Sequence, residues 1–230
     1  MHVFDEYRAP SPGAVADLVR EHPFALVVST ATGSSATGGD GPVPEATHLP
    51  VVPAPGTDLS AGLEGATLWG HMARVNPQWR QFADGARVLV VFTGAGGYVS
   101  PTTYGTTPAA PTWNYAAVHA VGRVRLLTEP AEALQVVTTT VAALEERRPE
   151  PWDMTGSLAY FRRILPGIQA FAVEVESVRA VFKMSQDKPA ELRDRVRAQF
   201  AAAAGSGPAV AATMDASPPG GCPVSGSTPA

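Results

Sequence analysis

Apolar residues recur along the chain with two different spacings, which assign helices and strands to different stretches. Apolar side chains three or four positions apart are typical of a helix with one buried face, whereas short branched runs or strict alternation are typical of strands. Helices are predicted over residues 11–21, 129–147, 158–165 and 189–203. Strands are predicted over residues 24–30, 46–52, 67–70, 87–93, 113–127, 168–175 and 178–184. Helices therefore flank a central set of strands.

The order of these elements predicts a mostly β fold with flanking helices, an antiparallel barrel of the α+β class. Strands follow one another at hairpin-like spacing, without the strand-helix rhythm of a parallel sheet. The alternation over residues 168–175 predicts a strand with one solvent-facing side. After Gly205 the composition narrows to small residues and proline. We therefore expect one domain over residues 1–203 and a disordered tail over residues 204–230.

Composition and charge argue against several classes of protein. The net charge of −4 comes without a block of like charges, which argues against a nucleic-acid surface. A single cysteine, Cys222, excludes an intrachain disulfide and a cysteine-rich zinc site. The first residues lack the order of a signal peptide, and no apolar run approaches the ~20 residues of a membrane span. We expect a cytoplasmic protein that does not enter a membrane.

The strongest candidate for ligand chemistry is His71, which follows Gly70 at the predicted end of the strand over residues 67–70. Imidazole suits iron and zinc, and a glycine lets a bulky group approach the backbone. A core histidine that braces the loop at Asn76 and Pro77 is the alternative. A histidine that ends a strand is more often a hydrogen-bonded core residue than a metal ligand, so these residue types alone favour the structural role.

A second candidate feature is the stretch over residues 102–112, which is rich in threonine and proline and bounded by aromatic residues. Loops of this length without periodicity are often functional. Tyr98, Trp113 and Tyr115 would form walls against a planar ring system, and barrel core is the alternative for each of them.

Several motifs together resemble one family, the small flavin-binding negative transcriptional regulators typified by the PaiB protein. They are Thr47-His48-Leu49-Pro50, Gly70-His71-Met72-Ala73 with Asn76-Pro77-Gln78-Trp79, Tyr98-Val99-Ser100-Pro101, Pro111-Thr112-Trp113-Asn114-Tyr115 with Val118-His119, and Phe182-Lys183-Met184-Ser185-Gln186. The resemblance covers roughly residues 1–200. It implies a split β-barrel of the flavin-reductase-like kind, as a homodimer with the cofactor pocket at the subunit interface.

Within this family the chain is most similar to the heme-dependent piperazate synthases. The similarity lies in residues 107–113, 152–155 and 157–167. It implies an enzyme that uses heme b to cyclise N5-hydroxy-L-ornithine to L-piperazic acid, by forming an N–N bond with loss of water and no net redox change. The alternative is an FMN- or heme-binding regulator without catalysis.

The resemblance also implies roles for individual residues. His71 is expected to be the axial ligand of the heme iron, with His48 as its competitor. Lys183, Ser185 and Gln186 match the cofactor-proximal motif, where a lysine and a serine would bind a flavin phosphate or a heme propionate. Trp113 and Tyr115 would contact the ring system, and Lys183 and Tyr98 are the candidates for the proton-accepting group.

Four further features are weaker. Arg74 and Arg80 are candidates for a propionate or a substrate carboxylate, and a solvated face is the alternative. His119 is expected to be structural. The segment Gly94-Ala95-Gly96-Gly97 lacks the histidine that the family has there, and we expect its glycines to leave room over a cofactor face. Cys222-Pro223 resembles a heme-contact motif, but chance is the favoured explanation.

Overall fold

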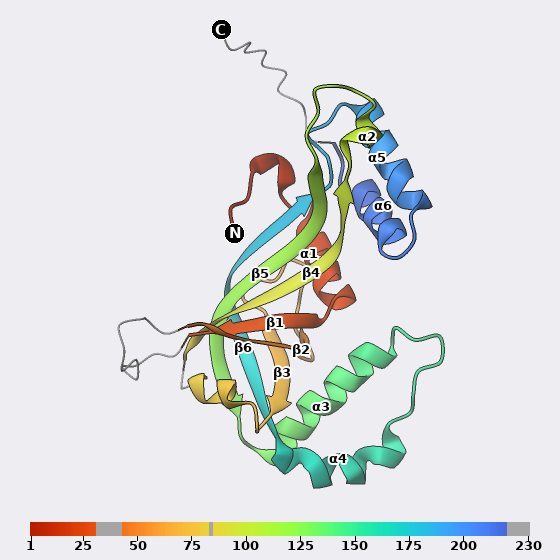
Figure 1. Ribbon diagram of the computed structural model, residues 1–230. Helices are drawn as coiled ribbons and strands as arrows, with labels where there is room; N and C mark the ends of the chain where they lie inside the picture. Colours follow the sequence, from red (N-terminus) through yellow and green to blue (C-terminus); the bar gives the residue numbers. More distant parts are fainter. Residues whose placement is uncertain (31–42, 83–84, 220–230) are drawn as a thin grey trace. The chain divides into compact units, whose positions relative to one another are not determined.

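The computed structural model describes residues 1–30, 43–82 and 85–219 (Figure 1). The strands are β1 (Phe24–Ser29), β2 (Glu45–Pro53), β3 (Thr67–Ala73), β4 (Arg87–Val99), β5 (Thr112–Leu127) and β6 (Ile168–Lys183). The helices are α1 (Pro12–Glu21), α2 (Pro101–Tyr104), α3 (Pro130–Glu145), α4 (Leu158–Ile164), α5 (Ala190–Ala202) and α6 (Gly207–Ala216). Short 3-10 turns are η1 (Asp5–Tyr7), η2 (Pro77–Gln81), η3 (Thr155–Ser157) and η4 (Leu165–Gly167). No helix within these residues is both long and apolar enough to cross a membrane.

The chain forms two compact units. One contains Met1–Ser11, Thr93–Ala117 and Ala180–Ala230, and the other contains Pro12–Phe92 and Val118–Arg179. We call them the terminal unit and the barrel unit. Strands β4, β5 and β6 pass from one unit into the other, because each of them contains a unit boundary.

The strands close into a barrel in the order β1-β2-β3-β6-β5-β4. Antiparallel ladders join β1 to β2 and β4, and β3 to β2 and β6. The prediction of a mostly β split barrel with flanking helices is confirmed. Inside the barrel unit, Phe82 and Phe171 are fully buried and meet edge to face with ring centroids 5.2 Å apart, an arrangement that aromatic pairs prefer.

Three strands are longer than their sequence patterns predict. Strand β3 continues to Ala73, so His71 lies within it and not at its end. Strand β4 continues through its glycines to Val99, where we expected it to stop at Thr93. The two strands predicted over residues 168–184 are one strand, β6. Glycine is a weak strand residue by propensity, and partner strands overrode that preference in β3 and β4.

Helix α3 changes the exposure of β6. Leu127, Ala133, Val136, Ala170 and Ala172 form one buried cluster, with Trp69 and Leu165 packed against it. Residues 169–173 of β6 are consequently buried on both faces. The predicted solvent-facing side of this strand is therefore wrong, because a helix covers it.

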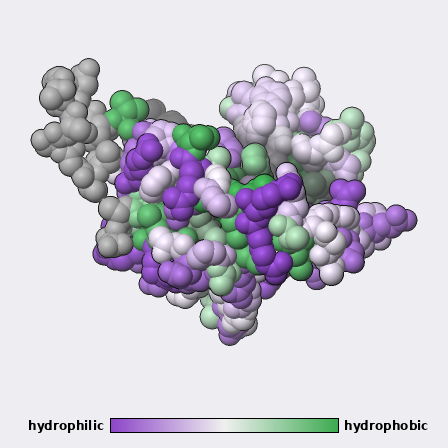
Figure 2. All heavy atoms as spheres, turned by 90° about the horizontal axis from the view of Figure 1, so that it is seen from below, coloured by the Kyte–Doolittle hydropathy of each residue, from purple (hydrophilic) through white to green (hydrophobic). Residues whose placement is uncertain are grey.

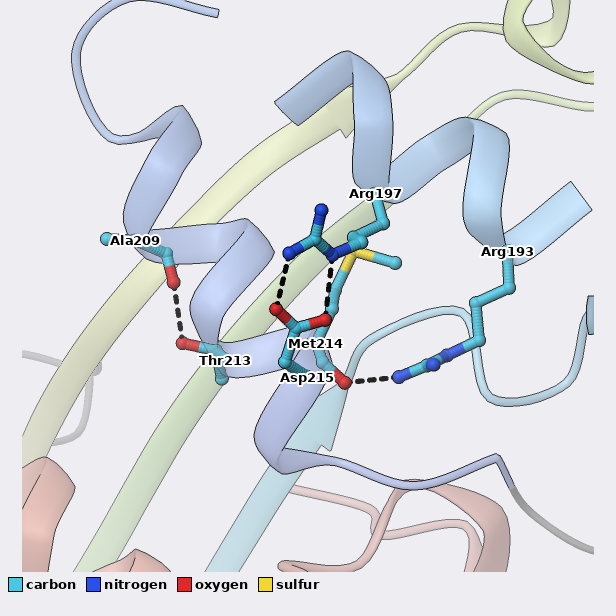
Figure 3. A network of polar contacts seen from close by, with 6 residues as sticks. All are labelled: Arg193, Arg197, Ala209, Thr213, Met214 and Asp215. Atoms are coloured by element: carbon cyan, nitrogen blue, oxygen red, sulfur yellow. Dashed lines mark hydrogen bonds and ion pairs between the residues drawn. The ribbon is translucent and has the colours of Figure 1, made fainter. Parts of the chain in front are cut away.

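The predicted disordered tail is wrong over residues 207–216, where the chain forms α6. Val210 and Met214 of α6 are fully buried. Arg197 of α5 holds Asp215 through two contacts of 2.8 and 2.7 Å, and Arg193 donates to the Met214 carbonyl (Figure 3). Packing against α5 thus orders a segment whose composition alone favours disorder. Residues 220–230, including Cys222, lie outside the described residues.

Candidate functional site

His71 lies on the outer face of β3. Side chains alternate along a strand, and Leu68, Gly70 and Met72 are the buried positions. His71 is only half-buried and stands beside Ala170, its partner on β6. The register of the strand therefore directs the imidazole away from the barrel core.

The imidazole of His71 has an unsatisfied nitrogen. Its Nδ1 is buried and has no hydrogen-bond partner among the described residues. Burial lowers the pKa of His71 below its usual 6.5, so the ring is neutral at neutral pH. A neutral imidazole is the form that ligates a metal, and it carries one nitrogen lone pair available to a metal ion or to a hydrogen-bond donor. The residue is therefore chemically ready for a ligand.

The loop after β3 is held by other residues than His71. Asn76 donates to Thr47 Oγ1 at 2.8 Å and accepts from the Gln78 backbone at 3.0 Å. The buried Gln78 amide donates to the carbonyls of Val27 and Glu45 at 3.0 and 3.1 Å. The sequence motif predicts a short helix that opens at Asn76 and Pro77, and the structure has the turn η2 there with Asn76 as its N-cap. The alternative in which His71 braces this loop has no hydrogen bond in its support.

His48 shares the outer face of the barrel with His71. Its neighbour Leu49 is buried, so His48 projects outward and is exposed. Phe24, which is 65% exposed, stacks on the His48 ring with centroids 5.7 Å apart and planes 22° apart. This pair presents an apolar and aromatic surface on β1 and β2, strands of the same sheet as β3.

The glycine before His71 serves the core. A Cβ at Gly70 would lie 2.6 Å from Phe171 Cζ and 3.2 Å from Leu49 Cδ1. The contact with Phe171 is too close for a real side chain and the one with Leu49 is tight, so the missing Cβ makes room for Phe171. The expectation that Gly70 lets a ligand approach the backbone is wrong.

The terminal unit contains the other predicted site residues. Lys183 donates to Thr112 Oγ1 at 2.7 Å, and its ammonium lies 5.5 Å from the centre of the Tyr7 ring. No ion pair among the described residues involves Lys183. Its two remaining N–H groups are therefore available to an anion.

Ser185 and Gln186, in contrast, use their polar groups within the protein. Ser185, buried with a φ of 59°, donates to Asn114 Oδ1 at 3.0 Å. The Gln186 side chain accepts from Met184 N at 2.6 Å and donates to the Phe182 carbonyl. We call this segment, residues 182–186, the lysine turn. These bonds fix its backbone, and they leave no donor of Ser185 for a phosphate.

The predicted aromatic walls lie together in the terminal unit. Tyr98 and Trp113 are each about half exposed, at 50% and 54%, with ring centroids 6.3 Å apart. A Cβ at Gly96 would lie 3.0 Å from Trp113 Nε1 and 3.2 Å from Tyr115 Cβ. One at Gly97 would lie 2.4 Å from Phe200. The glycines thus accommodate Trp113 and Phe200, and the expectation that they leave open space is wrong.

Sequence reasoning missed a polar cluster in the same unit. Tyr7 hydrogen-bonds to Asp187, and burial together with that carboxylate raises the pKa of Tyr7 to about 12. Lys188 pairs with Asp187 at 2.8 Å. Tyr104 is buried with an unpartnered hydroxyl. Only tertiary packing joins Tyr7 to residues so distant in sequence, so no local pattern could have revealed the cluster.

The remaining candidates have separate surroundings. Arg74 and Arg80 both lie over the Trp79 ring, at 5.7 and 5.3 Å from its centre. Burial lowers the pKa of His119, and the charge of Arg179 lowers it further. No group of three or more histidine, cysteine or carboxylate side chains within the described ranges could hold a metal ion.

The family model described as "Putative FMN-binding domain" matches residues 1–177. The chain belongs to this family. Protease synthase and sporulation protein PAI 2 of Bacillus subtilis is 32% identical over 190 residues, which are 82% of this chain and 83% of that protein. An uncharacterised protein of Emericella nidulans is 27% identical over 216 residues, 80% of this chain and 83% of its own length. The predicted PaiB-like family is thereby confirmed.

Two solved structures share the fold at low sequence identity. The FAD and heme binding protein of Mycobacterium smegmatis has a TM-score of 0.52 at 16% identity, covering 82% of this chain and 79% of that one. A conserved hypothetical protein of Mycobacterium tuberculosis also has a TM-score of 0.52, at 14% identity, covering 82% and 94%. At such identities the likeness extends to the barrel fold and not to its chemistry.

Proposed function

We propose that this PaiB-like protein binds heme through His71 and is a piperazate synthase. The observation that carries the heme assignment is the unpartnered, buried Nδ1 of His71 on the outer face of β3. A buried polar atom without a partner costs roughly 1–3 kcal/mol, and native proteins keep few of them. A ligand that fixes the imidazole would explain why this one is kept.

The residues around His71 fit a heme better than a free metal ion. The neutral imidazole supplies one protein ligand, and the described residues offer no cluster of three that a free ion would need. Phe24 and His48 add flat, exposed surface on the same side of the sheet. Flat apolar surface suits a porphyrin, because aromatic faces pack well on planar rings.

The substrate that we assign is N5-hydroxy-L-ornithine, on the basis of the resemblance to the heme-dependent synthases. Its α-amine nitrogen bonds to N5 while the N5–O bond breaks, the hydroxyl group takes the proton that the amine loses, and one water leaves. Bound heme would supply a Lewis-acidic iron that makes the hydroxyl a better leaving group. No electron donor is needed, since the electron pairs balance within one molecule.

The proposal gives roles to three residues of the chain. His71 would hold and orient the iron. Lys183, with two N–H groups free, would bind an anionic group of cofactor or substrate, and Lys183 and Tyr98 stay the candidates for proton transfer from the attacking amine. A homodimer with the pocket at the subunit interface and a cytoplasmic location belong to the same proposal.

The experiment that tests the heme assignment compares His71→Ala with the wild type after reconstitution with hemin. Loss of the ligand should lower the affinity for heme at least about tenfold and remove the Soret band of the heme-loaded protein. The matched control is His48→Ala, an exposed histidine on the neighbouring strand. It should retain the band. Full heme occupancy in His71→Ala, with loss in His48→Ala, would move the ligand to His48.

The experiment that tests the reaction incubates heme-loaded protein with N5-hydroxy-L-ornithine and follows loss of one water by mass spectrometry. The cyclic product should form with wild type and not with His71→Ala. A protein that binds heme through His71 but leaves the substrate unchanged would remain a heme-binding family member, and the synthase assignment would be rejected.

The second candidate is an FMN-binding regulator without catalysis, and the family description supports the FMN-binding part of it. In this case Lys183 would be the phosphate-binding residue, because the Ser185 hydroxyl donates to Asn114 and the Gln186 amide is hydrogen-bonded within the turn, whereas the Lys183 ammonium makes one hydrogen bond and has two further N–H groups. Purified protein with the two absorption bands of a flavin, and no Soret band after hemin addition, would establish this candidate over the first.

A further inference from the structure

The barrel unit has a second candidate binding site, a cavity between the end of β5, the start of α3 and the segment that joins α4 to β6. Its volume is about 610 Å³, within the range of small-molecule sites. The side chains that line it are apolar except for the hydroxyl of Thr128 and two cations, Arg74 and Arg162. The lining residues are Arg74, Leu127, Thr128, Pro130, Ala131, Ala133, Leu134, Arg162, Leu165, Pro166 and Ile168.

The two guanidinium groups have no acidic partner. Arg74 is held in place by a 2.8 Å bond from its Nε to the Ile168 carbonyl and by the Trp79 ring, which leaves its terminal nitrogens free. Arg162 lies in the last turn of α4, and no ion pair within the described part of the chain involves either arginine. Guanidinium stays charged at any physiological pH and binds carboxylates with two parallel bonds.

A second cavity of the barrel unit has arginines and carboxylates in the same lining. It has a volume of about 430 Å³ and lies between α1, β2 and α3. Its arginines, Arg20 and Arg147, share the lining with Asp17, Glu21 and Glu146. Arg20 pairs with Asp17 at 3.3 Å, and Arg147 donates to the Glu21 carbonyl at 2.5 Å. The lining of that cavity includes carboxylates beside its arginines, whereas the lining of the larger cavity includes none.

The apolar part of the larger cavity is built from the core. Leu127 and Ala133 belong to the buried cluster under α3, and Leu165 packs against it. Figure 2 views the molecule from the side on which Figure 1 shows α3 and α4, and there apolar surface lies directly beside strongly polar side chains. A ligand in this cavity would place hydrocarbon against the cluster and charge against the arginines.

We infer that this cavity binds a small amphipathic carboxylate, with its apolar body against Leu127, Leu134 and Leu165 and its carboxylate between Arg74 and Arg162. The inference does not depend on the proposed function. Two kinds of molecule have this chemistry: a free organic acid with a hydrocarbon chain, and heme, whose propionates are carboxylates on an apolar ring.

The test uses octanoate as the probe and 1-octanol as its uncharged match, each titrated calorimetrically into the full-length protein without cofactor. Octanoate should bind once per chain and at least about tenfold more tightly than octanol. Arg74→Gln and Arg162→Gln should each weaken octanoate binding by roughly fivefold or more and leave octanol binding unchanged. Equal affinity for the two probes, or unchanged octanoate binding in both variants, would overturn the inference.

The matched control is Arg80→Gln. Arg80 lies over the same Trp79 ring as Arg74 but does not line the cavity, so octanoate affinity should stay within about twofold. If the arginine variants fail to fold, Leu134→Trp tests the site by filling it, and octanoate binding that survives this change would contradict the inference. Displacement of octanoate by hemin would identify heme as the source of the carboxylates. Octanoate binding that hemin does not affect would identify a free acid.

Discussion

The outer face of β3 and the lysine turn differ in whether their buried polar groups have hydrogen-bond partners. Both matched the same family on sequence grounds, and both were expected to contact the cofactor. At β3 the structure leaves Nδ1 of His71 buried without a partner. At the turn, the side chains of Ser185 and Gln186 are buried and hydrogen-bonded to Asn114, Met184 and Phe182.

This difference separates two reasons for which a motif can persist. A polar group that is fully paired within the protein stabilises the fold and has nothing left for a ligand. A polar group that is buried and unpaired destabilises the fold, and a ligand can offset that cost. On this criterion His71 is the residue that we propose for ligand binding, and the hydrogen bonds of Ser185 and Gln186 assign these two residues to the fold. Lys183 lies between the two cases, with one hydrogen bond made and two further N–H groups.

The largest expected change in the free energy of unfolding comes from a substitution in the lysine turn. Gln186→Leu would leave Met184 N–H and the Phe182 carbonyl buried without partners, which should lower the free energy of unfolding by about 2–4 kcal/mol. Urea denaturation of the cofactor-free protein measures it. The matched control is Gln135→Leu on the exposed face of α3, where the change should stay within about 0.5 kcal/mol. A loss of ligand affinity in Gln186→Leu, without a loss of stability, would reverse the structural assignment.

The second expected effect is an increase in the free energy of unfolding. His71→Leu removes an unpaired buried nitrogen and puts an apolar side chain in its place, so the cofactor-free protein should become more stable by about 1 kcal/mol at pH 7.5. The same denaturation experiment measures this change. If His71→Leu destabilises the cofactor-free protein by as much as Gln186→Leu does, His71 is a structural residue and the contrast between the two regions disappears.

The smallest effect concerns pH. Because burial lowers the pKa of His71 below 6.5 in the folded state, the unfolded chain takes up more protons there as the pH falls. Stability is fully present above about pH 6.5 and decreases toward the lowered pKa. His71 accounts for at most about 0.7 kcal/mol of the loss between pH 7 and 6. His71→Leu should remove that part of the slope, measured by urea denaturation at several pH values, while His22 and His119, whose pKa values burial also lowers, keep theirs. An unchanged slope would mean that the pKa of His71 is the same in the folded and the unfolded protein.

Sequence patterns predicted the elements well and their ends less well. Apolar spacing located α1, α3, α4 and α5 to within a few residues, since local burial of one face determines such helices. It ended β3 and β4 too early at glycines, because ladder pairing with neighbouring strands outweighs a local preference. It missed α6 for a related reason. A segment rich in alanine and glycine becomes helical when α5 offers a surface to pack against.

The chain by itself determined the family, the barrel class and the identity of the candidate ligand, because ordered motifs and apolar spacing are properties of the sequence. The tertiary structure decided which polar atoms are satisfied. Whether His71 Nδ1 or Ser185 Oγ has a partner depends on residues far away in the chain, and whether Arg74 and Arg162 face an acid depends on what packs beside them. Partners of this kind are set by three-dimensional packing, and packing is what distinguishes a binding site from a structural motif of the same composition.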